Sequence, residues 1–119
     1  MQDELPYDIV YLPRENLVQI RLAGFWDDAT SRSYRAEMAA VLGRLSMEPR
    51  ILIDATEFPV QSQKVAADLS LIIEDPALPA CRVAIVTTNA LAQMQSRRIG
   101  PDHGVFTDTA LAMKWLTES

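Results

Sequence analysis

Polar residues that could take part in chemistry follow three apolar stretches of the 119-residue chain. These groups are Asp54-Ala55-Thr56, Thr87-Thr88-Asn89 and Thr107-Asp108. If the apolar stretches are strands of a parallel sheet, the polar groups meet at its carboxyl end, where open α/β sheets gather their ligands. Each group also precedes a helix-like segment, whose first amide groups favour an anion. Because Asn and Asp are common helix caps, we interpret Asn89 and Asp108 first as caps.

Asp54 does not have the surroundings of a phosphate-accepting aspartate. Such a site needs Mg²⁺, which takes further carboxylates, yet the preceding apolar stretch ends in Ala23-Gly24 and offers none.

The sequence also lacks the patterns of nucleotide and zinc sites. The four glycines fall in no nucleotide-binding spacing. One histidine, His103, and one cysteine, Cys81, are too few for a zinc site. The sequence therefore predicts no metal, cofactor or catalytic residue. An enzyme using only carboxylates stays open as an alternative, because pairing in space cannot be read from the sequence.

Charge and composition argue against several kinds of partner. Eleven basic and sixteen acidic residues give a formal net charge of −5, and the basic residues are scattered. This charge is unsuited to nucleic acid or to anionic membranes. No apolar run approaches the roughly 18 residues of a membrane span, and the N-terminal MQDELPYD does not resemble a signal peptide. We expect a soluble cytoplasmic protein with a single domain over residues 1–119.

The spacing of apolar residues predicts five strands. Residues 7–12 and 17–23 form a hairpin, and the second of these strands alternates Val18, Ile20 and Leu22 with polar residues. Residues 51–53 and 83–86 are apolar without alternation, as expected of strands covered on both faces. A short strand follows at 104–106.

Four helices are predicted between and after these strands. The first begins at Asp27-Asp28, and its apolar stripe comprises Tyr34, Met38, Val41, Leu42 and Leu45. The second carries Val65, Leu69, Ile72 and Ile73, the third runs from Asn89 to Ile99, and the last turns Leu111, Ala112, Trp115 and Leu116 inward. The order ββαβαβαβα predicts an α/β fold with a mixed, mostly parallel sheet of about five strands, an N-terminal β-hairpin and four helices.

This layout resembles the STAS domains, in particular the SpoIIAA-like family of small stand-alone bacterial proteins. The segments that carry the resemblance are LAGFWDD, ILIDATEF, CRVAIVTTNAL and GVFTDTALAMKWL, and together they extend from about Leu17 to Leu116. The resemblance implies a non-enzymatic regulatory module that binds a protein partner, of which a kinase-like anti-sigma factor is the best-known kind. It also places Asp54 at the polar end of a central strand, before a partner-facing helix.

In that family a serine in an Asp-Ser-Ser-Gly type motif is phosphorylated to switch partner binding. The corresponding stretch here, Pro59–Lys64, has neither an Asp-Ser pair nor a glycine. Ser62 is the one hydroxyl at the helix start and hence the candidate phosphoacceptor, but we favour a capping role for it. The resemblance therefore does not carry the phosphoserine switch over to this chain.

The predicted partner surface lies between the strand ends and the second helix. Its residues are Asp54, Thr56, Phe58, Val60, Ser62, Thr87, Thr88 and Asn89. We interpret the adjacent aromatics Phe25 and Trp26 first as an ordinary lid on the core; the alternative is that one of them is partly exposed and marks a contact surface. The alternative function is a carrier or sensor of a small hydrophobic molecule or lipid, because the family is similar in fold to CRAL-TRIO domains and the helices are rich in alanine and methionine. Such a carrier needs a cavity of roughly 300 Å³ or more. The apolar last helix also leaves a homodimer open.

Overall fold

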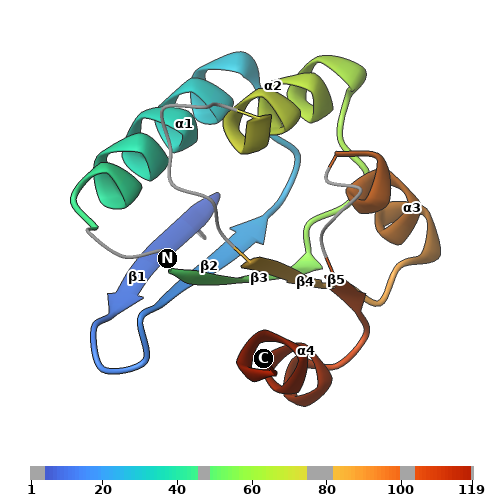
Figure 1. Cartoon of the computed structure of the whole chain (residues 1–119). Helices are drawn as coiled ribbons and strands as arrows, with labels where there is room; N and C mark the ends of the chain where they lie inside the picture. Colours follow the sequence, from blue (N-terminus) through green and yellow to red (C-terminus); the bar gives the residue numbers. More distant parts are fainter. Residues whose placement is uncertain (1–4, 46–48, 75–81, 100–103, 119) are drawn as a thin grey trace, which may run out of the picture.

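The sheet has five strands in the order β1-β2-β3-β4-β5 (Figure 1). The computed structural model describes residues 5–45, 49–74, 82–99 and 104–118, and the side chains of all of these except 70–74 and 96–99. Strand β1 (Tyr7–Leu12) pairs antiparallel with β2 (Leu17–Ala23). Strands β2, β3 (Arg50–Glu57), β4 (Arg82–Val86) and β5 (Gly104–Phe106) are parallel. The predicted mixed, mostly parallel sheet with an N-terminal hairpin is confirmed.

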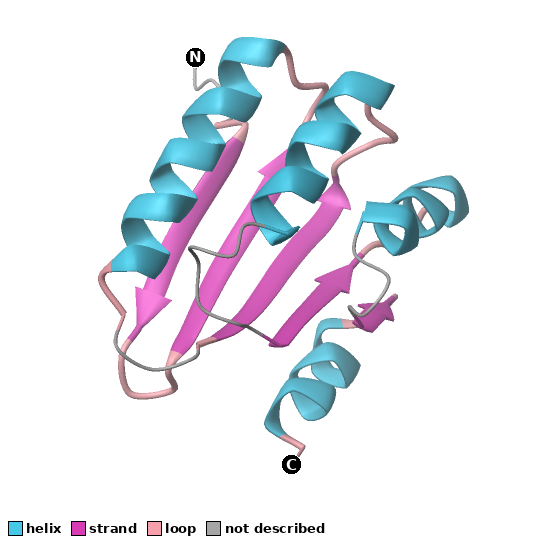
Figure 2. Ribbon diagram, turned by 45° about the horizontal axis from the view of Figure 1, so that its top comes forward, coloured by secondary structure: helices cyan, strands magenta, loops and turns pink. Residues whose placement is uncertain are grey.

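The four helices lie on the two sides of this sheet (Figures 1 and 2). Helices α1 (Asp28–Gly43) and α2 (Gln63–Glu74) cover one face, and α4 (Thr109–Thr117) covers part of the other. Helix α3 (Ala90–Ile99) contacts α2 and β5. Because successive strands are neighbours in the sheet, each parallel connection crosses to the adjacent strand through one helix.

Side-chain caps start the helices where the sequence predicts them. Asp27 Oδ1 accepts a hydrogen bond from the Thr30 amide at 2.8 Å, at the start of α1. Asn89 Oδ1 accepts from two amides of α3, at 2.9 and 3.0 Å. Asp108 does the same for α4. These bonds satisfy amide groups that have no partner within the helix.

Two apolar cores hold the layers together. The core between the sheet and α1 and α2 includes Val18, Ile20, Leu22, Trp26, Tyr34, Met38, Leu42, Ile51, Val65 and Ile85. The core beneath α4 comprises Leu17, Leu52, Ala84, Val86, Ala112 and Leu116. Strand β4 is buried on both faces from Val83 to Val86, as its unbroken apolar sequence predicts.

The predicted inward face of α4 needs one correction. Ala112 and Leu116 are buried, but Leu111 is 55% exposed. One residue turns an α-helix by about 100°, so Leu111 lies to the side of the face that Ala112 turns to the sheet. Trp115 is half-buried, and the Arg82 guanidinium lies 3.9 Å from its ring centroid.

No helix in the described ranges combines the length and apolar character needed to cross a bilayer. Cys81 and His103 lie outside the described residues.

Candidate functional site

The carboxyl ends of β2, β3 and β4 meet at one edge of the sheet, and their arrowheads point the same way in Figure 2. Three segments leave the sheet there, namely residues 24–27 toward α1, 58–62 toward α2 and 87–89 toward α3. We call these segments, together with the first turn of α3, the carboxyl-end rim. The first segment is joined to the end of β3, just before the second segment, where the Gly24 amide donates to the Glu57 carbonyl at 3.1 Å.

Gln61 holds the rim together from inside. Its side chain is 5% exposed. The Oε1 atom accepts from the Trp26 amide at 2.9 Å, and Nε2 donates to the carbonyls of Gly24 at 3.0 Å and Pro59 at 2.7 Å. Three backbone groups from two loops are thus satisfied by one buried amide. Gln61 also forms two hydrogen bonds with Gln95 of α3. One network therefore connects segments 24–27 and 58–62 with α3, the helix that follows segment 87–89.

Gly24 allows the chain to turn as it leaves β2. Its φ is +74°, a left-handed conformation in which a side chain is strained. The turn directs Trp26 into the core, where it is 7% exposed. The centroid of its ring lies 5.1 Å from the ring centroid of Phe58. Phe25 is left 80% exposed. Trp26 thus covers the core, and Phe25 is the exposed member of the pair, which was the less favoured alternative.

Asp54 lies at an irregular point of the sheet. Between the pairs Arg21↔Asp54 and Ala23↔Glu57, β3 has one more residue than β2, which is a bulge. Asp54 Oδ1 accepts from the Thr56 amide at 3.0 Å and from its hydroxyl at 2.7 Å. Asp54 therefore stabilises the bulge from the same side of the sheet as α4.

The remaining predicted surface residues differ in exposure. Thr56, Ser62, Thr88 and Asn89 are exposed, Val60 is 38% exposed, and Phe58 is half-buried against Trp26. Thr87 is a correction, because it is only 1% exposed. Its amide donates to the Phe106 carbonyl at 2.9 Å and continues the β4–β5 ladder by one residue, so its side chain stays within the packed sheet.

Ser62 occupies the start of α2. Its Oγ accepts from the Val65 amide at 3.2 Å, and its carbonyl accepts from the Ala66 amide at 3.0 Å. This is the geometry of a helix cap. The side chain is exposed, so the hydroxyl is also accessible from solvent.

Several exposed apolar side chains lie at the rim, and only some of them were predicted from the sequence. Phe25 is 80% exposed, Val60 38% and Leu91 66%, and Met94, just beyond the rim on α3, is 49% exposed. Phe25 follows β2, Val60 follows β3, and Leu91 follows β4 in the first turn of α3. Neither Leu91 nor Gln61 was predicted from the sequence to belong to this site. The exposed side of α3 could have been noticed from Leu91 and Met94, but Gln61 carries no local signal.

Two charges beside the rim are held by neighbouring groups. The Thr30 amide lowers the pKa of Asp27, so its carboxylate stays ionised as the cap of α1. A hydrogen bond to Asp28, 2.7 Å away, raises the pKa of Lys64, so the ammonium group also stays charged. Among the described residues no three His, Cys, Asp or Glu side chains form a cluster suited to a metal ion.

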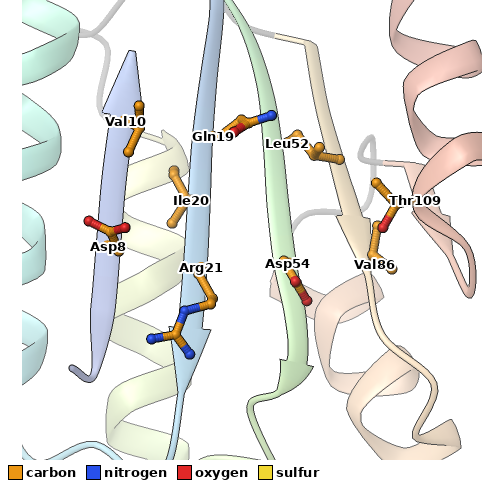
Figure 3. Close-up of a pocket in the computed structure, with 9 residues that line it drawn as sticks. All are labelled: Asp8, Val10, Gln19, Ile20, Arg21, Leu52, Asp54, Val86 and Thr109. Carbon is orange, nitrogen blue, oxygen red and sulfur yellow. The ribbon is translucent and has the colours of Figure 1, made fainter. Parts of the chain in front are cut away.

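A hollow of the described surface lies elsewhere, on the α4 side of the sheet (Figure 3). Its volume is about 240 Å³, and it is lined by Asp8, Val10, Gln19, Ile20, Arg21, Leu52, Asp54, Val86 and Thr109. The carrier hypothesis requires a larger, mainly apolar cavity of roughly 300 Å³ or more. This hollow has three charged residues in its lining, so it gives that hypothesis no support.

The fold and this rim place the chain among α/β proteins with helices on both sides of a mixed sheet. Two of the solved structures that are similar in fold superpose on nearly all of this chain. An uncharacterised protein of the DUF3478 family with a SpoIIAA-like fold, from Shewanella loihica PV-4, superposes with a TM-score of 0.69 at 21% identity, over 98% of each chain. An anti-sigma factor antagonist from Mycobacterium paratuberculosis superposes with a TM-score of 0.66 at 11% identity, over 94% of this chain and 95% of that one.

The chain therefore has a SpoIIAA-like fold, as its sequence pattern predicts. No protein-family model matches the sequence. No curated protein matches it either.

Proposed function

We propose that this chain is a non-enzymatic regulatory domain that binds a protein partner through its carboxyl-end rim. One observation carries the proposal. Phe25, Val60 and Leu91 are exposed, and they follow three neighbouring parallel strands at the same edge of the sheet. Exposed apolar side chains that gather on one surface are typical of protein-interaction sites, whereas single ones are ordinary.

The network around Gln61 supports this role. A loop that is already ordered loses little conformational freedom on binding, so more of the contact energy appears as affinity. Gln61 fixes the loop through bonds to Gly24, Trp26 and Pro59 before any partner arrives. The exposed Thr56, Ser62, Thr88 and Asn89 supply polar groups around the apolar residues, an arrangement common at interfaces.

The structural likeness to an anti-sigma factor antagonist supports a regulatory protein as the partner, and a kinase-like anti-sigma factor is the kind we propose. Ser62 remains the candidate for regulation by phosphorylation, although its hydroxyl also caps α2. The single-domain organisation over residues 1–119 and a cytoplasmic location are part of the same proposal.

A matched pair of leucine variants tests the rim. The tagged chain is used to capture partners from an extract of its own host, and Leu91→Ser is compared with Leu111→Ser. Both leucines are exposed helix residues, at 66% and 55%, but only Leu91 lies at the rim. We expect Leu91→Ser, especially combined with Phe25→Ser, to weaken capture roughly tenfold or more. Leu111→Ser should bind as the unmodified chain does.

The proposal fails if every captured protein binds the Phe25→Ser, Leu91→Ser double variant as strongly as the unmodified chain. Far-UV circular dichroism shows that each variant is folded. Binding of purified partner, measured by calorimetry, then separates a direct effect from one exerted through another protein.

A further inference from the structure

The face of the sheet that carries α4 is only partly covered. Helix α4 packs on β3, β4 and β5. On the same face, Asp8 and Val10 of β1 and Gln19 of β2 are exposed, Val10 to 43%. The opposite face is closed by α1 and α2, which lie side by side over it (Figure 1). The described part of the molecule thus lacks a second helix beside α4.

Strand register arranges this open face in two rows. Asp8, Arg21 and Asp54 are paired across β1, β2 and β3 and form one row. Val10, Gln19 and Leu52 form the next (Figure 3). Because side chains two residues apart point to the same face of a strand, both rows face the hollow of about 240 Å³ beside Thr109 of α4.

The charged row is predominantly negative. Arg21 Nη1 donates to Glu57 Oε2 at 3.1 Å, so its charge is balanced by a carboxylate next to the row. Asp8 makes no ion pair within the described residues, and Asp54 accepts hydrogen bonds only from Thr56 among them. The carboxylates of Asp8 on β1 and Asp54 on β3 therefore form no ion pair within the described residues, and the row keeps a net negative charge.

We propose that this open face binds an amphipathic helix rich in lysine or arginine from a protein partner. Such a helix would lie beside α4 and complete its layer. Its apolar side would cover Val10 and the edge of the hollow, and its basic residues would approach Asp8 and Asp54. This surface is separate from the carboxyl-end rim, and the inference does not depend on the proposed function.

Charge also argues against a second copy of the chain as the occupant. Each copy has a formal net charge of −5 and would bring the same acidic row to the interface. Like charges that face each other across an interface disfavour binding, whereas a basic helix gains both steering and contact energy. The exposed apolar area is small, so we expect dissociation constants on the order of 10 to 100 µM.

An NMR titration of the ¹⁵N-labelled chain tests the inference. The probe is a capped peptide of about 18 leucine and lysine residues at helical spacing, long enough to form a helix. The control replaces every lysine with glutamate. We expect the lysine peptide to shift the amide signals of Val10, Gln19 and their neighbours in β1 and β2, while those of Phe25, Val60 and Leu91 stay in place. The glutamate peptide should cause no such shifts.

Charge variants with opposite expected signs distinguish recognition from loss of structure. Asp8→Asn and Asp54→Asn should each weaken binding of the lysine peptide about two- to fivefold, the usual worth of an exposed ion pair. Arg21→Gln should strengthen it by a similar factor, because it removes the positive charge from the row. A variant that only damaged the fold would weaken binding in all three cases.

The inference is overturned if the lysine peptide does not bind or if its shifts map to the rim or to α1 and α2. It is also overturned if the glutamate peptide binds equally well. A dimer seen by sedimentation overturns it too, if the amide signals of Val10 and Gln19 shift as the dimer forms. The rim proposal survives any of these outcomes, since its test uses Phe25 and Leu91.

Discussion

Gln61 and Gln95 are joined by a reciprocal pair of hydrogen bonds. The Gln61 amide donates to Gln95 Oε1 at 2.8 Å, and Gln95 Nε2 donates to the Gln61 carbonyl at 3.0 Å. The Gln95 side chain thus pairs with the backbone of the 58–62 loop as a neighbouring strand would. Since Gln61 also holds Gly24 and Trp26, the position of the rim loop is coupled to both α1 and α3.

The Gln61→Ala substitution should destabilise the protein by about 2–3 kcal/mol. It removes the partner of the buried Trp26 amide and of two part-buried carbonyls, and an unsatisfied buried group is costly. Urea unfolding measures the change, and an unaltered m-value shows that the unfolded state is comparable. The exposed Gln63→Ala serves as control and should change stability by less than about 0.5 kcal/mol. A loss from Gln61→Ala no greater than that of the control would contradict the assigned role.

Local patterns in the sequence are sufficient to predict the helix starts and the central strands. Helix starts at Asp27, Asn89 and Asp108 could be predicted because a cap and its amides lie within three residues of each other. Strands β3 and β4 could be predicted because burial on both faces leaves an unbroken apolar run. These features depend on neighbours in the chain.

The rim was harder to predict because its contacts join distant segments. Gln61 is 34 to 37 residues from Gln95, Trp26 and Gly24, and nothing near it in the sequence signals burial. Thr87 reads as part of a polar cluster, yet β4 continues its pairing by one residue and buries it. The sequence leaves open whether Phe25 or Trp26 is exposed, and only the turn at Gly24 decides it.

The Tyr34→Phe substitution should leave stability unchanged or raise it by up to about 1 kcal/mol. Tyr34 is 4% exposed, and its hydroxyl makes no hydrogen bond among the described residues, so removing it relieves a buried polar group. Tyr7→Phe is the matched control. Its hydroxyl bonds to Ser33 and Glu37, so the same substitution there should be destabilising, by about 0.5–1 kcal/mol. Thermal unfolding of both variants gives the sign directly, and equal losses would show that Tyr34 has a partner.

Alkaline pH should destabilise the protein partly through the same tyrosine. Burial raises the pKa of Tyr34 far above its ordinary value of 10.0, and burial together with Glu37 raises that of Tyr7. The unfolded chain therefore loses these protons first, so the two tyrosines leave stability independent of pH below about pH 10 and lower it as pH rises above that value. We expect Tyr34→Phe to show a shallower decline than the unmodified chain between about pH 9 and 11. Parallel slopes in urea titrations at these pH values would refute this assignment.

The same substitution at two glycines should have opposite effects on stability. Gly24 has a φ of +74°, and a Cβ added there would meet no atom within 4 Å, so Gly24→Ala introduces backbone strain without a clash and should cost about 1 kcal/mol. Gly43 closes α1 with open space around it and no positive φ. Gly43→Ala should therefore stabilise the helix by about 0.5–1 kcal/mol. Gly24→Asn should fall between the unmodified chain and Gly24→Ala, because asparagine tolerates the left-handed conformation better than alanine does. Urea unfolding of the three variants tests the order, and a neutral Gly24→Ala would mean that the turn relaxes away from its positive φ.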